Sequence, residues 1–193
     1  MAEIKPVAEV VPIIGFLFTE DIEPDYVNGE LSARCGRSIM HSQKIPFTHT
    51  DYYSKEMAAV IFRQWHAYEK KILPGELAEI KTFTNLVEKK YLNENKGRMI
   101  NIDPGYISLS NLVLASTKNY SHRIYLDLGI YAEITLIFKH EHFMPLEWTY
   151  PDYKEPAAIE FFEKVRKNFK EKRFLDSLVF LVNLVYLVIG IWS

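Results

Sequence analysis

The alternation of apolar and polar positions predicts the elements of the first third of the chain. Residues 10–18 form an apolar run rich in β-branched side chains, which is typical of a buried strand. A helix should follow, because Val27, Leu31 and Cys35 recur on one helical face. Residues 38–47 then predict a second strand.

The next apolar segment, residues 57–72, fits two patterns. Met57, Ile61 and Trp65 have helical spacing, whereas Phe62 and the aromatic residues around it favour a strand. We predict a strand. The fold class depends on this assignment.

The clearest helix begins after Pro74 and ends at the polar loop of residues 93–97, and a strand over residues 99–103 follows it. The order strand, helix, strand, strand, helix, strand is the split βαβ arrangement of ferredoxin-like domains. We therefore predict an α+β domain with a ferredoxin-like core. The apolar stripe of this helix consists of Leu77, Ile80, Thr84, Val87 and Tyr91.

The second half of the chain extends this core. Strands are predicted over residues 111–116, 122–128 and 130–138, and an amphipathic helix begins at Pro156. We expect an antiparallel hairpin and a terminal helix, so that residues 1–173 form a single α+β domain. The inward face of the helix consists of Ala158, Phe162, Val165 and Phe169.

The register of the hairpin follows from keeping its apolar and polar sides apart. A three-residue loop, residues 128–130, would pair Tyr125 with Glu133 and Arg123 with Thr135. Side chains paired across an antiparallel ladder point to the same face. These four residues are therefore predicted to share a face, and the same register pairs Asp127 with Tyr131.

Composition narrows the class of function. The chain has 193 residues, 48% of them apolar, which is enough for a sizeable core. Its 23 basic and 25 acidic residues provide no global positive field for nucleic acid. Cys35 is the only cysteine, which excludes an internal disulfide. The first residues lack a signal-peptide pattern, and we expect a cytoplasmic protein.

The helix after Pro74 carries a line of polar residues beside its apolar stripe. Lys81, Asn85 and Glu88 are spaced by four and three residues and project from one side. One interpretation is a solvated outer face with weak pairing. The other is the wall of a cleft, which Thr84 favours by interrupting the apolar stripe.

Asn101 and Asp103 lie on one side of a short strand, directly before Pro104 and Gly105. Asp103-Pro104-Gly105 has the residues of a type II turn, with proline at its second position and glycine at its third. Asp103 is also a candidate cation ligand or general base, with Asn101 and Glu133 as its partners.

Lys118, His122 and Arg123 form a basic cluster, and Tyr125 follows it. Such donors can neutralise a phosphate or a carboxylate, and arginine does so with two hydrogen bonds. The alternative is a basic loop at the end of a strand. His49 and Asp51 could likewise ligate a metal, although no third ligand is evident nearby.

Motifs of established chemistry are absent from the sequence. It contains no Gly-x-x-x-x-Gly-Lys-Ser/Thr loop, no Gly-x-Gly-x-x-Gly after the first strand, no serine-hydrolase elbow and no paired-cysteine zinc motif. Residues 148–153 are aromatic and interrupted by Pro151. They indicate an ordered loop packed on the sheet rather than a platform for base stacking.

Two short motifs stand out, Asp-Tyr-Tyr at residues 51–53 and Asn-Ile-Asp-Pro-Gly-Tyr at residues 101–106. Through them the chain resembles a prokaryotic family of unknown function, over roughly residues 8–170. Family members are often labelled GTP-binding proteins, which implies a nucleotide ligand but carries over no catalytic residue. Further residues that carry the resemblance are Glu56, Met57, Lys81, Thr84, Asn85, Glu88, Lys118, His122 to Tyr125, and Trp148 to Tyr153.

Residues 174–193 form an apolar tail after a basic stretch. As a helix, residues 177–193 would be about 25 Å long, somewhat short of the roughly 30 Å hydrocarbon core of a bilayer. A membrane anchor on the cytoplasmic side is one interpretation. The others are a cover for the domain, a dimer interface and an altered reading frame.

These patterns support one main hypothesis, a cytoplasmic domain that binds a small anionic ligand such as a nucleotide or a phosphate ester. Asp103, Glu133 and His122 are the candidate catalytic residues, and the first two could instead bind a divalent cation such as magnesium. The alternative is a non-enzymatic interaction module tethered through its tail. The candidate ligand-binding residues are Lys81, Asn85, Asn101, Lys118, Arg123 and Tyr125.

Overall fold

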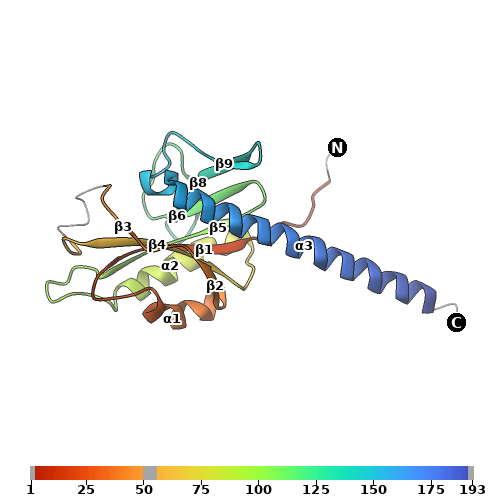
Figure 1. The fold of residues 1–193 in the computed structure, drawn as a ribbon, viewed down its shortest axis with the longest axis horizontal. Coiled ribbons are helices and arrows are strands. Elements are labelled where there is room, and N and C mark those ends of the chain that lie inside the picture. Colours follow the sequence, from red (N-terminus) through yellow and green to blue (C-terminus); the bar gives the residue numbers. More distant parts are fainter. Residues whose placement is uncertain (1–2, 50–55, 191–193) are drawn as a thin grey trace.

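The computed structural model describes residues 3–49 and 56–190, with side chains up to residue 185 in the last helix. In this part of the chain, nine strands form one antiparallel sheet and three α-helices pack around it (Figure 1). The elements are β1 (Val11–Thr19), α1 (Asp25–Cys35), β2 (Ser38–His41), β3 (Ile45–Pro46), β4 (Ile61–Tyr68), η1 (Pro74–Glu76), α2 (Leu77–Glu88), β5 (Ile100–Ile107), β6 (Asn111–Ser116), β7 (Ile124–Asp127), β8 (Ile130–Lys139), β9 (His142–Pro145), η2 (Pro151–Lys154) and α3 (Pro156–Gly190).

The first half of the sheet has the predicted ferredoxin-like topology. The strand order is β2-β4-β1-β5-β6-β8-β7, so β4 separates β2 from β1, as the split βαβ unit requires. The ambiguous segment 57–72 contains strand β4, as predicted. The predicted strand over residues 38–47 is divided into β2 and β3, both of which pair with β4.

Two apolar layers hold the sheet between its helices. On one face, Ile14, Phe16 and Phe18 of β1 belong to the core that includes the buried side of α1 and α2. On the other face, Val11 and Ile13 belong to the core that includes α3. Figure 1 shows α1 and α2 on one side of the sheet and α3 on the other. Because side chains alternate along a strand, β1 contributes apolar residues to the cores on both faces of the sheet.

The hairpin of β7 and β8 forms, but the predicted register is wrong. Tyr125 pairs with Tyr131, and the register shifts between Tyr125 and Asp127. The loop contains only Leu128 and Gly129, whose φ angles of 54° and 75° are both positive, as in a type I′ turn. A bulge on β7 thus absorbs the extra residue that we had assigned to the loop.

The prediction of a type II turn at Asp103-Pro104-Gly105 is also wrong, because strand β5 continues through these residues. Gly105 does not have a positive φ angle, and each of the three residues pairs with β1. Gly105 is instead required for close approach, since a Cβ atom there would lie 2.4 Å from the backbone oxygen of Val113.

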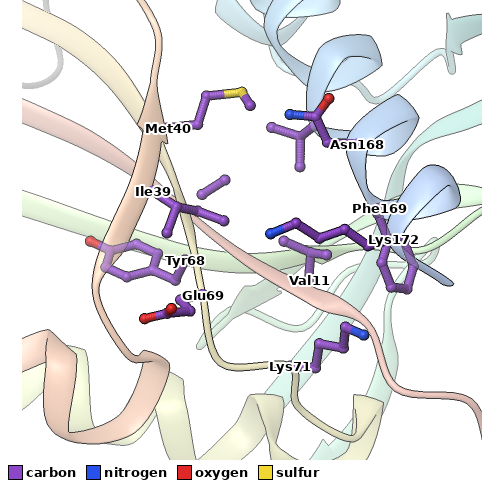
Figure 2. A pocket seen from close by; sticks show the side chains of 11 residues that line it. Val11, Ile39, Met40, Tyr68, Glu69, Lys71, Asn168, Phe169 and Lys172 are labelled. Atoms are coloured by element: carbon purple, nitrogen blue, oxygen red, sulfur yellow. The ribbon is translucent and has the colours of Figure 1, made fainter. Parts of the chain in front are cut away.

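Helix α3 packs its first half on the sheet with the predicted residues Ala158, Phe162, Val165 and Phe169 buried. A shallow, largely apolar groove of about 150 Å³ lies between this half and strands β2 and β4 (Figure 2). Beyond residue 173 the helix extends away from the sheet (Figure 1). Over the part of the chain that the structure describes, no helix has the length and apolarity needed to cross a membrane.

Candidate functional site

The site is built where the sheet splits between β5 and β6. β6 pairs with β5 only at Gly105, Tyr106 and Ile107, so residues 100–104 have β1 as their single neighbour. Backbone groups on the opposite edge of this part of β5 need other partners. Pro104 suits the split, because a strand tolerates a residue without an N–H group where a neighbour is missing.

Side chains of α2 replace the missing strand. Nζ of Lys81 donates to the carbonyl oxygen of Ile102 at 2.8 Å, and the N–H of Ile102 donates to Oε1 of Glu88 at 2.7 Å. Lys81 and Glu88 are both buried, as is Thr84 between them. The polar line of Lys81, Asn85 and Glu88 is therefore the wall of a cleft and not a solvated outer face. Burial raises the pKa of Glu88, although Lys81 opposes this.

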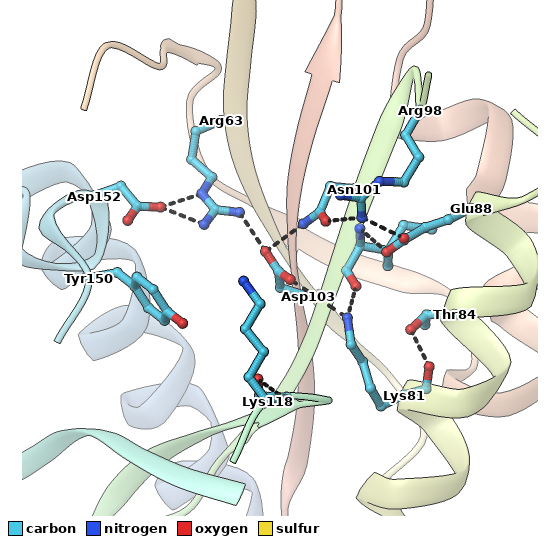
Figure 3. Close-up of polar contacts among 12 residues, drawn as sticks. Arg63, Lys81, Thr84, Glu88, Arg98, Asn101, Asp103, Lys118, Tyr150 and Asp152 are labelled. Carbon is cyan, nitrogen blue, oxygen red and sulfur yellow. Dashed lines mark hydrogen bonds and ion pairs between the residues drawn. The ribbon is translucent and has the colours of Figure 1, made fainter. Parts of the chain in front are cut away.

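The predicted pair Asn101 and Asp103 does share one face of β5. Nδ2 of Asn101 donates to Oδ2 of Asp103 at 2.8 Å, and Nη1 of Arg98 donates to Oδ1 of Asn101 at 2.7 Å. Arg98 also pairs with Glu88 and Glu56. Hydrogen bonds thus connect the loop before β5, helix α2 and the carboxylate of Asp103 (Figure 3).

Arg63 on β4 approaches the same carboxylate from the other side. Its Nε donates to Oδ2 of Asp152 at 2.6 Å, and its Nη1 donates to Oδ2 of Asp103 at 3.4 Å. Arg63 and Asp152 are almost fully buried, with 4% and 3% exposure. Burial alone would lower the pKa of Arg63, but the charges of Asp152 and Asp103 outweigh it and raise the pKa.

Asp103 is held as a carboxylate that remains open to solvent. Burial would raise its pKa, but Lys81, Arg63 and the hydrogen bond from Asn101 together lower it. About a quarter of its side chain, 27%, is exposed. Oδ1 lies 3.7 Å from Nζ of Lys81, whereas Oδ2 accepts both hydrogen bonds. Oδ1 is therefore the oxygen best placed to meet a ligand.

Glu133 on β8 organises a second cluster. Its carboxylate accepts a hydrogen bond from Nε of Arg123 at 2.7 Å and lies 3.3 Å from Nε2 of His122. The ring of His122 is stacked between Tyr120 and Trp148, with centroids 6.0 Å and 5.0 Å away. Arg123 and Glu133, predicted to share a face, are thus brought together despite the different register.

The remaining donors of Arg123 bind the surrounding loops. Nη1 donates to Oγ of Ser116 and to the carbonyl oxygen of Lys118, and Nη2 donates to the hydroxyl of Tyr150. The side chain of Arg123 is only 3% exposed. Arg123 therefore fixes the loop that carries Lys118 rather than presenting its charge to solvent.

The split of the sheet opens into a cavity of about 720 Å³. It is lined by residues from β1, β4, β5, β6, β8 and α2 and by the loop around η2. The side chain of Lys118 points toward Asp103 (Figure 3). Of the residues predicted as functional, the lining includes Lys81, Asn85, Asn101, Asp103, Lys118 and Glu133.

Three of the predicted site residues, His122, Arg123 and Tyr125, are not part of the lining. His122 and Arg123 contact Glu133 from behind the lining, and Tyr125 is exposed on the outer edge of the hairpin against Tyr131. Asp51 lies outside the described residues, whereas His49 lines the cavity and pairs with Glu155 at 3.4 Å. Residues 148–153 pack on the sheet as predicted, with Trp148 donating to the carbonyl oxygen of Ile134.

The sequence predicted Asn101 as a partner of Asp103, but it did not predict Arg63, Arg98, Tyr150 or Asp152 as site residues. Arg63 carried a signal, since it is the one charged residue inside the apolar strand of residues 61–68, where a charge must be paired. Tyr150 and Asp152 were noted only as part of the family resemblance, and no local pattern indicated that their loop folds against the cavity. Arg98 lay in a loop without periodicity.

The described residues offer no group of three or more His, Cys, Asp or Glu side chains that could hold a metal ion. Any cation at Asp103 would need oxygen atoms from a ligand or from water to complete its coordination.

The fold and the cavity define a class of α+β protein, with a ferredoxin-like core and a polar cavity where the extended sheet splits. The family described as Domain of unknown function (DUF4416) matches residues 8–169, and the chain belongs to this family. No curated protein and no solved structure matches the chain. The matched residues include the entire cavity lining and end before the apolar part of α3.

Proposed function

We propose that the cavity binds a small anionic ligand, a nucleotide or another phosphate ester. The observation that carries this proposal is the polar lining of a cavity of about 720 Å³, a size within the roughly 300–1,000 Å³ typical of small-molecule sites. Its described lining includes the basic side chains Arg63, Lys81, Lys89, Arg98 and Lys118.

The anionic group of the ligand would lie between α2 and the loop after β6. Lys81, Asn85 and Lys89 line the cavity from the helix, and Ser116, Thr117 and Lys118 line it from the loop. Lysine ammonium groups and hydroxyls are ordinary donors to phosphate oxygens. Arg123 has a positioning role in this proposal, because its hydrogen bond to the carbonyl oxygen of Lys118 holds the loop.

The less polar part of the ligand would contact the apolar and aromatic part of the lining. Leu17, Phe47, Leu114 and Tyr150 supply this surface. An aromatic ring or a sugar would gain from burial there, as in many nucleotide sites. This division of the lining favours a phosphate ester with an organic group over inorganic phosphate.

Asp103 is the candidate ligand for a divalent cation that arrives with the phosphate. Magnesium is commonly held by one or two carboxylates together with phosphate oxygens and water. The lowered pKa of Asp103 keeps it ionised at neutral pH, which suits cation binding better than proton abstraction. Glu133 is engaged by Arg123 and His122, so these three residues support the wall beside the ligand.

Calorimetric titration of the full chain with nucleotides and sugar phosphates, with and without magnesium, tests the proposal. We expect Lys118→Met to weaken binding by about 10- to 100-fold, because a charge-assisted hydrogen bond contributes on the order of 1.5–3 kcal/mol. Lys139→Met is the matched control, since Lys139 is exposed at the far end of β8. Absence of heat with every ligand would contradict the proposal.

A further inference from the structure

The end of α3 exposes a continuous apolar surface that the cavity does not explain. Between residues 174 and 185, the large apolar side chains are 41–67% exposed. Soluble domains rarely present contiguous apolar patches of this kind unless something covers them. The side chains are Phe174, Leu175, Leu178, Val179, Phe180, Leu181, Val182, Leu184 and Val185.

Apolar side chains occupy every side of this helical segment. Successive residues of an α-helix point about 100° apart, so the run 178–182 covers every direction around the axis. The polar residues of the segment are only Asp176, Ser177 and Asn183, and Asp176 pairs with Lys71 at 3.2 Å. A helix that is apolar on all sides is normally surrounded by apolar material.

Because residues 174–185 are apolar on all sides, two kinds of partner can be distinguished, a second copy of the helix and a lipid phase. A second copy of the helix would cover one stripe and leave the opposite stripe in water, because a paired coiled coil needs only a narrow apolar seam. A lipid phase would cover all sides at once. Residues 174–185 therefore fit lipid better than a single helical partner.

The charge beside the segment matches an anionic lipid surface. Residues 164–173 contain six basic residues and one acidic residue, Glu171. Lys164, Lys167, Lys170 and Lys172 are exposed. Basic residues directly beside an apolar segment are attracted by anionic headgroups, each contributing on the order of 1 kcal/mol near the surface.

We propose that residues 174–185 insert into one leaflet of an anionic lipid bilayer, with the basic residues of 164–173 against the headgroups. The segment is about 18 Å long, well below the roughly 30 Å of a hydrocarbon core. The segment can therefore insert without crossing the bilayer. The insertion depends on surfaces outside the cavity and is independent of the proposed ligand.

Co-sedimentation of the full chain with vesicles tests this proposal. We expect binding to vesicles of phosphatidylcholine mixed with phosphatidylglycerol, and weaker binding to phosphatidylcholine alone or at high salt. Lys167→Glu combined with Lys170→Glu should reduce binding to the anionic vesicles. A full chain that stays in the supernatant with both vesicles would overturn the proposal.

Charged substitutions on different sides of the helix separate lipid insertion from protein pairing. Val179→Glu and Leu181→Glu lie on roughly opposite sides, and in lipid each should weaken binding by about tenfold or more. Leu86→Glu is the control, since Leu86 is an exposed apolar residue of helix α2, outside the inserted segment. Loss of binding on one side only, together with a dimer in light scattering, would show that a second copy covers the segment. The melting temperatures of the variants should match that of the unmodified chain, so that misfolding is excluded as the cause of weaker lipid binding.

Discussion

Arg63 is the residue on which the floor of the cavity depends. It pairs with Asp152 and reaches Asp103, and it lies 5.1 Å from the ring of Tyr153. Arg63→Met would leave the carboxylate of Asp152 buried without its counterion. We expect it to lower the free energy of unfolding by about 3–5 kcal/mol, measured by urea denaturation.

Two further variants make this prediction specific. Adding Asp152→Asn to Arg63→Met should restore part of the lost stability, because the uncompensated charge is removed. Arg37→Met is the matched control, since Arg37 pairs with Glu69 on the surface, and it should change little. Equal effects of Arg63→Met and Arg37→Met would contradict the role given to the buried pair.

His66 makes stability sensitive to mildly acidic pH. Burial, assisted by the nearby ring of His41, lowers its pKa to about 4, and Asp25 only partly opposes this. The folded state therefore disfavours the proton. The stability contributed by neutral His66 is complete above the unfolded pKa of 6.5 and is lost as the pH falls toward 4.

We expect the chain to lose about 2 kcal/mol of stability through His66 between about pH 7 and pH 5. His66→Gln should be less stable at neutral pH but should show a flatter pH dependence in urea denaturation. His140→Gln, at an exposed position in the turn between β8 and β9, serves as the control. An unchanged slope in His66→Gln would assign the pH dependence to other groups.

At the scale of elements, the β7–β8 turn carries a local strain. Leu128 has a φ angle of 54°, and its side chain is 56% exposed. Asparagine adopts this left-handed conformation more readily than leucine. Leu128→Asn should therefore raise the unfolding free energy by about 0.5–1 kcal/mol, measured by thermal and urea denaturation.

Ile124→Asn provides the comparison within the same hairpin. Ile124 is 71% exposed but lies in strand β7. Asparagine is disfavoured in strands, so no gain is expected there. A gain at both positions would mean that polarity, and not the turn, is responsible.

Helix α2 shows how an element can take over the role of another. The hydrogen bonds that β6 would make to Ile102 are made by Lys81 and Glu88, so the sheet can open without leaving buried backbone groups unpaired. The cavity is a consequence of this substitution. A polar line on a helix beside an apolar stripe can thus serve a neighbouring strand edge instead of solvent.

At the scale of the whole molecule, the domain should be independent of the end of α3. Residues 174–185 are exposed, and the ion pair between Lys71 and Asp176 is exposed as well. A chain that ends after Arg173 should keep the melting temperature of the full chain within about 2 °C, because surface ion pairs contribute little. A clear decrease in calorimetry would mean that the segment stabilises the domain.

The fold was largely predictable because its signals are local. Apolar periodicity identified the helices and the strands around them, and chain order alone led to the ferredoxin-like core. The prediction of a turn at residues 103–105 was wrong because proline and glycine each have more than one structural role. Pro104 and Gly105 are ordinary turn residues, yet here one tolerates an open strand edge and the other admits the backbone of β6.

The candidate site was predictable only in part. Asn101 and Asp103 were placed correctly on one face because side chains alternate along a strand. Their partner Arg63 lies 40 residues from Asp103 in the chain, and Asp152 lies 89 residues from Arg63. No local pattern reports such pairings.

The helices, most strands and the apolar, basic-flanked end of α3 could be predicted from the amino-acid sequence, because they depend on periodicity and composition within short segments. The separation of β5 from β6, the inward direction of Lys81 and Glu88, and the pairing of Arg63 with Asp152 emerge only in the folded chain. Buried charges and open backbone groups must find partners, and the packing of distant segments selects which partners they find.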